Sequence, residues 1–189
     1  MTTDRGLSTD SSKTSIPVGN DTRRLFAVCF QRFHSDVVRY ARRRVGPEMA
    51  GDVAAEVFVV AWRRIDDLMS VDNQLAWLYG VARLTVANTM RSERRRSTLQ
   101  RRTAAATGLE EPSEPSGGTE TLAALGRLAP KDQEVLRLVA WEGLKGKALA
   151  LALGTSEVAA RSRLHRARRR FERALGAERA LTTKGERHD

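Results

Sequence analysis

The sequence predicts an all-α protein of two small helical domains joined by a flexible linker, with a helix-turn-helix in the second domain. Apolar residues recur at intervals of three and four residues through most of the chain, whereas the two-residue alternation of a half-buried strand is rare. A stretch rich in Pro, Gly and Glu at 103–121 divides this pattern in two. The 189 residues suit one or two small domains and leave little room for a large catalytic scaffold.

The first domain is expected over residues 22–102 and begins with a helix over 21–44. Five apolar residues fall on one face of this helix at intervals of 4, 3, 4 and 3: Phe26, Phe30, Phe33, Val37 and Tyr40. Gly46 and Pro47 end it, because glycine and proline interrupt helices. Residues 1–21 before it are mostly polar and small, which predicts a disordered tail.

The next helix is expected over 48–68 and carries two apolar stripes. The first stripe consists of Val53, Val57, Val60 and Ala61, and the second of Phe58, Trp62 and Ile65. One stripe can serve the core of the domain. The second stripe is equally consistent with burial in a small three-helix core and with contact to a partner.

A third helix begins after Asp72 or Asn73 as N-cap and ends in an arginine-rich run. Its core face holds Leu75, Leu78, Tyr79, Ala82 and Val86. Residues 91–102 carry six Arg and one Glu, a net charge of +5, and the linker at 103–121 carries four Glu without a basic residue. The acidic linker could fold back on the basic helix or lie in a positively charged groove of a partner.

The second domain is expected over 122–176, followed by a tail at 177–189. A short helix with Leu122, Leu125 and Leu128 precedes a helix that begins at Pro130 and stops at Gly143. The helix-turn-helix follows from the four-residue spacing of Ala150 and Gly154, since a small residue permits close crossing and glycine permits a left-handed turn. Ser156 is the expected N-cap of its second helix. Gly146 is expected to weaken the first helix of the helix-turn-helix by about 1 kcal/mol relative to alanine.

The helix after Ser156 is the strongest indication of a nucleic-acid partner. Its narrow apolar stripe consists of Ala160, Leu164, Ala167, Phe171 and Leu175. Seven arginines and two glutamates give residues 156–173 a net charge of +5. A helix that packs by one thin seam and presents guanidinium groups elsewhere suits the major groove of DNA better than plain solvation.

Other function classes find little support in the sequence. His34, His165 and His188 are scattered, and no Gly-rich phosphate loop follows a strand, so we expect no metal, no cofactor and no enzymatic activity. Cys29 lies between Val28 and Phe30, which favours a buried thiol. No signal peptide or membrane-spanning run is present, and a cytoplasmic location is the default expectation.

Three segments resemble bacterial RNA polymerase sigma factors of the compact extracytoplasmic-function type. They are DVAAEVFVVAWRR at 52–64, AWLYGVARLTVANTMRSERRR at 76–96, and VLRLVAWEGLKGKALALALGTSEVAARSRLHRARRRF at 135–171. The resemblance implies a region 2-like domain at 22–102 and a region 4-like domain at 122–176. It also implies partners: core RNA polymerase through its β′ clamp helices and β flap, promoter DNA, and an anti-sigma protein.

The resemblance further assigns roles to individual residues. Contact with core polymerase falls to Asp52, Glu56, Phe58 and Trp62, and contact with the −10 element to Arg83, Asn88, Arg91, Arg94 and Arg95. Contact with the −35 element falls to Ser156, Glu157, Arg161, Ser162, Arg163, Arg166, Arg168, Arg169 and Arg170. The loop at 66–74 is where the family holds an unstacked base, while Trp77 and Leu78 are expected in the core.

Several positions depart from the family's usual residues, and one competing function stays open. Ala55, Leu84, Asn88 and Ala148 stand where the family commonly has Gln, Asn, Asp and Glu. The alternative is a helix-turn-helix repressor or activator that acts without docking on core polymerase. The two functions differ at the surface formed by residues 52–62.

Overall fold

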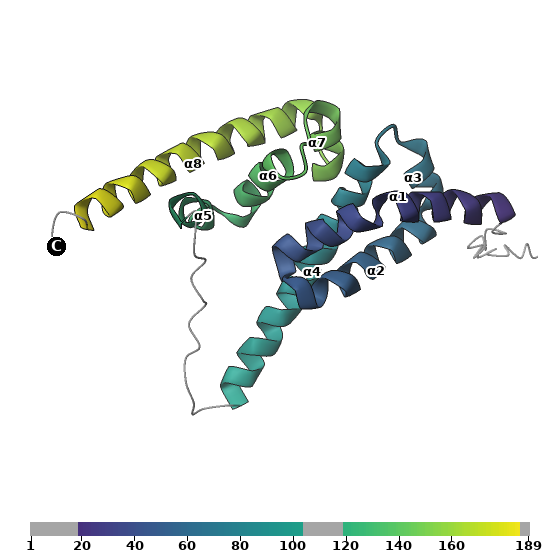
Figure 1. Ribbon diagram of the computed structural model, residues 1–189, viewed down its shortest axis with the longest axis horizontal. Coiled ribbons are helices and arrows are strands. Elements are labelled where there is room, and N and C mark those ends of the chain that lie inside the picture. Colours follow the sequence, from purple (N-terminus) through teal and green to yellow (C-terminus); the bar gives the residue numbers. More distant parts are fainter. Residues whose placement is uncertain (1–18, 104–118, 186–189) are drawn as a thin grey trace, which may run out of the picture.

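The computed structural model describes residues 19–103 and 119–185, and this part of the chain is helical without a β-strand, which confirms the all-α prediction. Figure 1 shows the helices in two groups, α1 to α4 and α5 to α8. The tail at 1–18, the linker at 104–118 and residues 186–189 lie outside the described residues.

The first group consists of α1 (Asn20–Val45), α2 (Pro47–Arg63), α3 (Ile65–Ser70) and α4 (Gln74–Thr103). The expected face of α1 is buried at Phe33, Val37 and Tyr40, and Cys29 is buried beside it. Burial raises the pKa of the Cys29 thiol, although the nearby Arg32 opposes the shift. Leu78 on α4 is fully buried, which confirms its expected place in the core.

The helix expected over 48–68 is interrupted at Arg64. Its backbone angles of φ −121° and ψ 39° depart from helical values, so α2 ends at Arg63 and α3 starts at Ile65. The change of direction accompanies the burial of Ile65 and Leu68, with α3 packed against α4. Most of the loop expected at 66–74 is therefore helix α3.

The start of α4 matches one of its two expected N-caps. The Asn73 side-chain oxygen Oδ1 accepts a hydrogen bond from the backbone N–H of Ala76 at 2.9 Å. This bond satisfies an N–H that has no partner within the helix.

The second group consists of α5 (Thr119–Gly126), α6 (Pro130–Ala140), α7 (Gly146–Leu153) and α8 (Glu157–Gly185). Pro130 occupies the first turn of α6, as expected. The apolar seam of α8 is buried at Ala160 and Ala167. Helix α8 continues to Gly185, past residue 176 where the domain was expected to end.

The turn between α7 and α8 has the geometry that the sequence predicts. Gly154 adopts the left-handed conformation with φ +61°, and its N–H donates to the Leu151 carbonyl. The Thr155 N–H donates to the Ala150 carbonyl at 3.0 Å, which completes a Schellman motif. The Ser156 Oγ accepts from the Ala159 N–H at 3.3 Å and so caps α8.

We predict that Gly154→Ala lowers the free energy of unfolding by about 1–2 kcal/mol, because a Cβ is strained in the left-handed conformation. Gly51→Ala is the matched control, since Gly51 lies within α2 with open space around its Cβ position. The control should stabilise the protein by about 0.5–1 kcal/mol. Urea denaturation of both variants measures the difference, and equal shifts would contradict the assigned turn.

The expectation for Gly146 is wrong. Gly146 begins α7 with φ +49°, and a Cβ placed there would lie 3.3 Å from the Glu157 Oε1. A left-handed residue gains nothing from the helix propensity of alanine. Glycine therefore fits this position better than the alanine that propensity favours.

The two domains pack against each other through α4 and α7. A Cβ on Gly80 of α4 would lie 3.4 Å from the Ala152 carbonyl oxygen of α7, so the helices approach closely there. Buried side chains from both domains form one apolar cluster that crosses the interface. The sequence predicts two domains on a tether but contains no sign of this interface.

Candidate nucleic-acid interface

The second apolar stripe of α2 packs within an aromatic cluster. Phe58 is only 4% exposed, and its ring centroid lies 4.8 Å from that of Phe30 on α1. Trp62 is half-buried, with its ring centroid 5.0 Å from that of Phe26. Packing in the core thus accounts for the apolar side chain at position 58. The predicted contact of Phe58 with a partner stays a prediction.

Acidic and apolar side chains share the exposed face of α2. Asp52 and Glu56 are exposed one turn apart, and Val59 follows on the same face with 47% of its surface exposed. Sequence reasoning missed Val59, although its spacing from Asp52 and Glu56 places it outside both apolar stripes. An exposed valine between charged groups suits a protein-docking surface better than a nucleic-acid contact.

Four of the five candidates for the −10 element are exposed along α4: Asn88, Arg91, Arg94 and Arg95. Asn88 accepts a hydrogen bond from Arg91 through its side-chain oxygen. Arg83 instead faces the second domain, where its guanidinium donates to the Ala152 carbonyl at 3.3 Å and the Leu153 carbonyl at 3.5 Å. These carbonyls end α7, where the helix dipole favours a positive charge.

The candidates for the −35 element lie at the start and along the exposed sides of α8. All are exposed except the half-buried Glu157, whose carboxylate forms a 3.8 Å ion pair with Arg161. Arg170 pairs at 2.5 Å with Asp132, a buried acid on α6 that sequence reasoning did not single out.

A cavity of about 910 Å³ brings the two arginine sets together where the domains meet. Helix α4 contributes Arg91 and Arg94, and α8 contributes Arg163, Arg166 and Arg170. Arg161, Arg168 and Arg169 are not among its lining residues. The cavity wall includes nine basic residues and two acidic ones, so it is strongly cationic.

Arg137 of α6 also lines this cavity, and sequence reasoning missed it. Its guanidinium carbon lies 5.5 Å from the centroid of the Trp141 ring, while its Nε is buried without a hydrogen-bond partner among the described residues. Burial lowers the pKa of Arg137, and the like charge of Arg44 lowers it further against the opposing effect of Glu134. Neither periodicity nor motif could have marked it, because its setting depends on tertiary contacts.

Residues 19–103 and 119–185 contain neither a metal-ligating cluster nor a membrane-spanning helix. No group of three or more His, Cys, Asp or Glu side chains could hold a metal ion. None of the helices in these ranges combines the length and the apolar character needed to cross a bilayer.

Comparison with known protein families gives two matches that coincide with the two domains. The model of sigma-70 region 2 matches residues 29–96, and the model of sigma-70 region 4 matches residues 119–171. Together they cover α4 as far as Arg96, within its basic run, and the helix-turn-helix with its arginine-rich helix as far as Phe171.

A curated relative is the probable RNA polymerase sigma factor RfaY of Xanthomonas campestris pv. campestris. It is 32% identical over 126 residues, which are 62% of this chain and 32% of the relative. The chain therefore matches about a third of the length of that protein.

Two solved structures share the fold. The sigma factor RpoE from Bartonella quintana, crystallised with the anti-sigma factor NepR, has a TM-score of 0.57 at 20% identity, covering 81% of this chain and 98% of that one. CnrH, in complex with the cytosolic domain of CnrY, has a TM-score of 0.55 at 25% identity, covering 82% of this chain and 90% of that one.

Proposed function

We propose that this chain, which belongs to the sigma-70 family of RNA polymerase sigma factors, has the extracytoplasmic-function form, binds core RNA polymerase and directs it to promoters. The observation that carries the proposal is the pairing of region 2 and region 4 with two arginine-rich helices, α4 and α8. A protein with these two elements contacts two separated sites on DNA, which suits promoter recognition.

The polymerase contact is assigned to the exposed face of α2. Asp52 and Glu56 supply negative charge, Val59 supplies apolar area, and Trp62 lies at the edge of the aromatic cluster. Such a mixed surface supports a protein partner with basic groups around an apolar centre. Phe58 supports this surface from beneath, since its side chain is buried.

The DNA contacts are divided between the domains. Helix α4 offers Asn88, Arg91, Arg94 and Arg95 for the −10 element, where a basic track suits the backbone of an opened strand. Helix α8 enters the major groove at the −35 element, with Arg161 and Ser162 near its N-terminus reading base edges. Arg168 and Arg169 further along contact phosphates.

The remaining roles follow from this assignment. Sigma factors are regulatory subunits, so the chemistry of RNA synthesis belongs to polymerase and this chain has no catalytic site of its own. Its place of action is the cytoplasm, where polymerase and promoters are. An anti-sigma protein is a further partner, by analogy with the complexes of RpoE with NepR and of CnrH with CnrY.

The deciding experiment is run-off transcription with purified core polymerase on genomic fragments. We expect a stable holoenzyme and transcripts that start at defined promoters and depend on this protein. If no holoenzyme forms while the isolated protein binds a duplex operator tightly, the repressor or activator alternative is correct instead.

We predict that Arg161→Ala weakens initiation from −35-dependent promoters by about 10-fold or more, as expected for the loss of a guanidinium that reads a base. Arg161 is exposed, and its ion pair with Glu157 is long at 3.8 Å, so the fold should not change. Arg24→Ala on α1 is the control, since it removes one exposed positive charge far from α8 in sequence. Equal losses in both variants would show a general charge effect and contradict the assignment.

A further inference from the structure

Val158 is the second residue of α8, and its side chain lies in solvent. Its exposed fraction is 71%, compared with 62% for Val28 on α1 and 47% for Val59 on α2. Ala160, two residues further on, is 1% exposed and belongs to the buried seam of α8. Because successive residues are about 100° apart around a helix, Val158 lies on the side opposite this seam. Core packing therefore does not explain an apolar side chain at position 158.

The side chains beside Val158 are candidates for the −35 element. Arg161 and Ser162 follow it by three and four residues, so the three side chains share one face of α8. Arg161 and Ser162 are exposed, and so is His165 one turn further along the same face. The N-terminal residues of a recognition helix are those that contact base edges. The face thus offers hydrogen-bonding groups together with one branched apolar group.

Glu157, the first residue of α8, lies against the preceding helix. Its side chain is half-buried, and its Oε1 lies 3.3 Å from the position that a Cβ on Gly146 would occupy at the start of α7. It also forms the long ion pair of 3.8 Å with Arg161. A glutamate that reads DNA accepts a hydrogen bond from the amino group of cytosine, which requires a carboxylate free to enter the groove. Val158 is therefore the first side chain of α8 that projects freely from this face.

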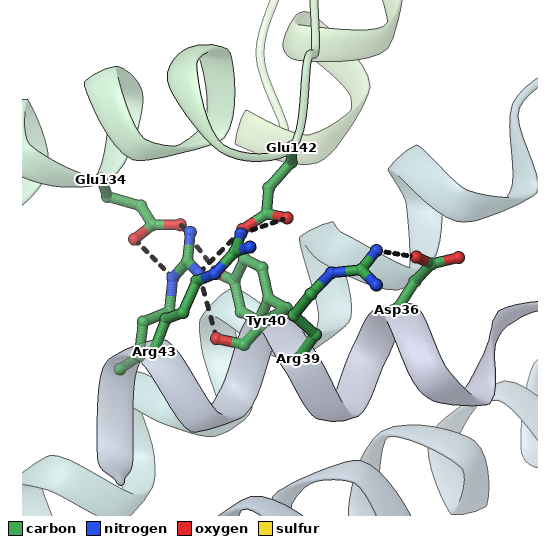
Figure 2. Close-up of polar contacts among 7 residues, drawn as sticks. Asp36, Arg39, Tyr40, Arg43, Glu134 and Glu142 are labelled. Carbon is green, nitrogen blue, oxygen red and sulfur yellow. Dashed lines mark hydrogen bonds and ion pairs between the residues drawn. The ribbon is translucent and has the colours of Figure 1, made fainter.

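The contacts between the two domains leave Val158 accessible. Arg44 of α1 donates to Glu134 on α6 and to Glu142 just after α6, each at 3.0 Å. Figure 2 shows both carboxylates directed toward α1. Neither Val158 nor Ser162 lines the cavity between the domains. Since Val158 is exposed with both domains present, a DNA duplex can approach this end of α8.

Thymine is the base that a branched apolar side chain distinguishes in the major groove. It carries a 5-methyl group there, whereas cytosine presents an amino donor at that edge and the purines present N7 and a further polar group. Valine can pack against the methyl group, but packed against a polar base edge it leaves a donor or acceptor without a partner, which is costly. The arginines along α8 supply the positive charge that attracts the phosphate backbone.

We propose that Val158 selects a thymine in the −35 element by packing its methyl groups against the 5-methyl group of that base. This inference rests on the proposed function, because it takes α8 as the helix that reads the −35 element. Arg161 and Ser162 read neighbouring bases through hydrogen bonds, and Val158 adds apolar discrimination at one position.

The test removes methyl groups from each side of the contact in turn. Full-length protein, with core polymerase present, selects duplexes from a random-sequence pool, and each thymine of the enriched −35 sequence is then replaced by deoxyuridine, which lacks only the 5-methyl group. We expect one position at which this replacement weakens binding about 3- to 5-fold, the effect of one buried methyl group. Val158→Ala should lose this sensitivity because its side chain is too short, whereas Val158→Ile should keep it.

The matched control is Val28→Ala, which shortens an exposed valine on α1. It should bind both duplexes as the unaltered protein does. Measuring every variant on the thymine and the deoxyuridine duplex forms a double-mutant cycle, so a general change in affinity cancels. Circular dichroism checks that each variant keeps its helices.

Three results would overturn the thymine contact. The unaltered protein binds every thymine duplex and its deoxyuridine counterpart equally, or Val158→Ala keeps the sensitivity to the methyl group. In the third, Glu157→Gln abolishes a preference for cytosine while Val158→Ala changes nothing, which means that the acid reads the base at this end of α8.

The proposed function is tested separately by transcription. If methyl sensitivity depends on Val158 but the protein forms no holoenzyme, the thymine contact stands and the proposed function is wrong. A pool from which no sequence is enriched would overturn both the thymine contact and the DNA contact assigned to α8.

Discussion

Reversing two charges, with Asp52→Arg/Glu56→Arg, is expected to weaken binding to core polymerase by about 100-fold, since like charges placed across an interface cost several kcal/mol. Both side chains are exposed on one face of α2, and neither forms an ion pair with another of the described residues. The fold should therefore be retained. Fluorescence anisotropy of the labelled protein titrated with core polymerase measures the loss.

The matched control is Asp21→Arg, a charge reversal in the first turn of α1. Asp21 is exposed and lies on a different helix from the face shared by Asp52, Glu56 and Val59. Its reversal should change polymerase affinity far less than the double variant does. If the two variants bind equally well while circular dichroism shows native helices, the polymerase surface lies elsewhere on the protein.

Leu78→Ala is expected to lower the free energy of unfolding by about 2–5 kcal/mol, the usual cost of a cavity left by a buried leucine. Leu78 is fully buried in the core of the first domain. Leu84, six residues later on α4, is 56% exposed, and Leu84→Ala should change stability by no more than about 0.5 kcal/mol.

Urea denaturation, followed by circular dichroism and by tryptophan fluorescence, measures the free energy of unfolding of both leucine variants. Two probes are needed because a two-domain protein can unfold in more than one step. The same substitution on the same helix controls for helix propensity, so any difference reports burial. Similar losses in both variants would place Leu78 outside the core.

The helices and the turn of the helix-turn-helix follow from sequence patterns because they depend on neighbours within one or two turns. The buried face of α1 at Phe33, Val37 and Tyr40 and the left-handed turn at Gly154 occur where spacing and residue type predict them, whereas Phe30 on the same predicted face is exposed. The two arginine-rich segments are equally visible, because charge along a helix needs no tertiary information. The resemblance to the family depends on the same segments.

The errors arise where local preference and tertiary packing disagree. The break at Arg64 has no proline or glycine to mark it, and it accompanies the packing of α3 against α4. Helix propensity predicts that Gly146 weakens its helix, but the backbone of Gly146 is left-handed and a Cβ there would be crowded by Glu157. The sequence pattern allows the second apolar stripe of α2 to face either the core or a partner. The packing of Phe58 against Phe30 of α1 decides that Phe58 faces the core.

The sequence by itself determined the all-α class, the two domains and the two basic helices, because periodicity, turn residues and charge act over short stretches of chain. The tertiary structure alone decided how the domains meet. Arg44 pairs with residues 90 and 98 positions away, and the cavity collects arginines from helices at opposite ends of the chain. Contacts over such separations leave no period in the sequence, since they depend on where whole helices pack.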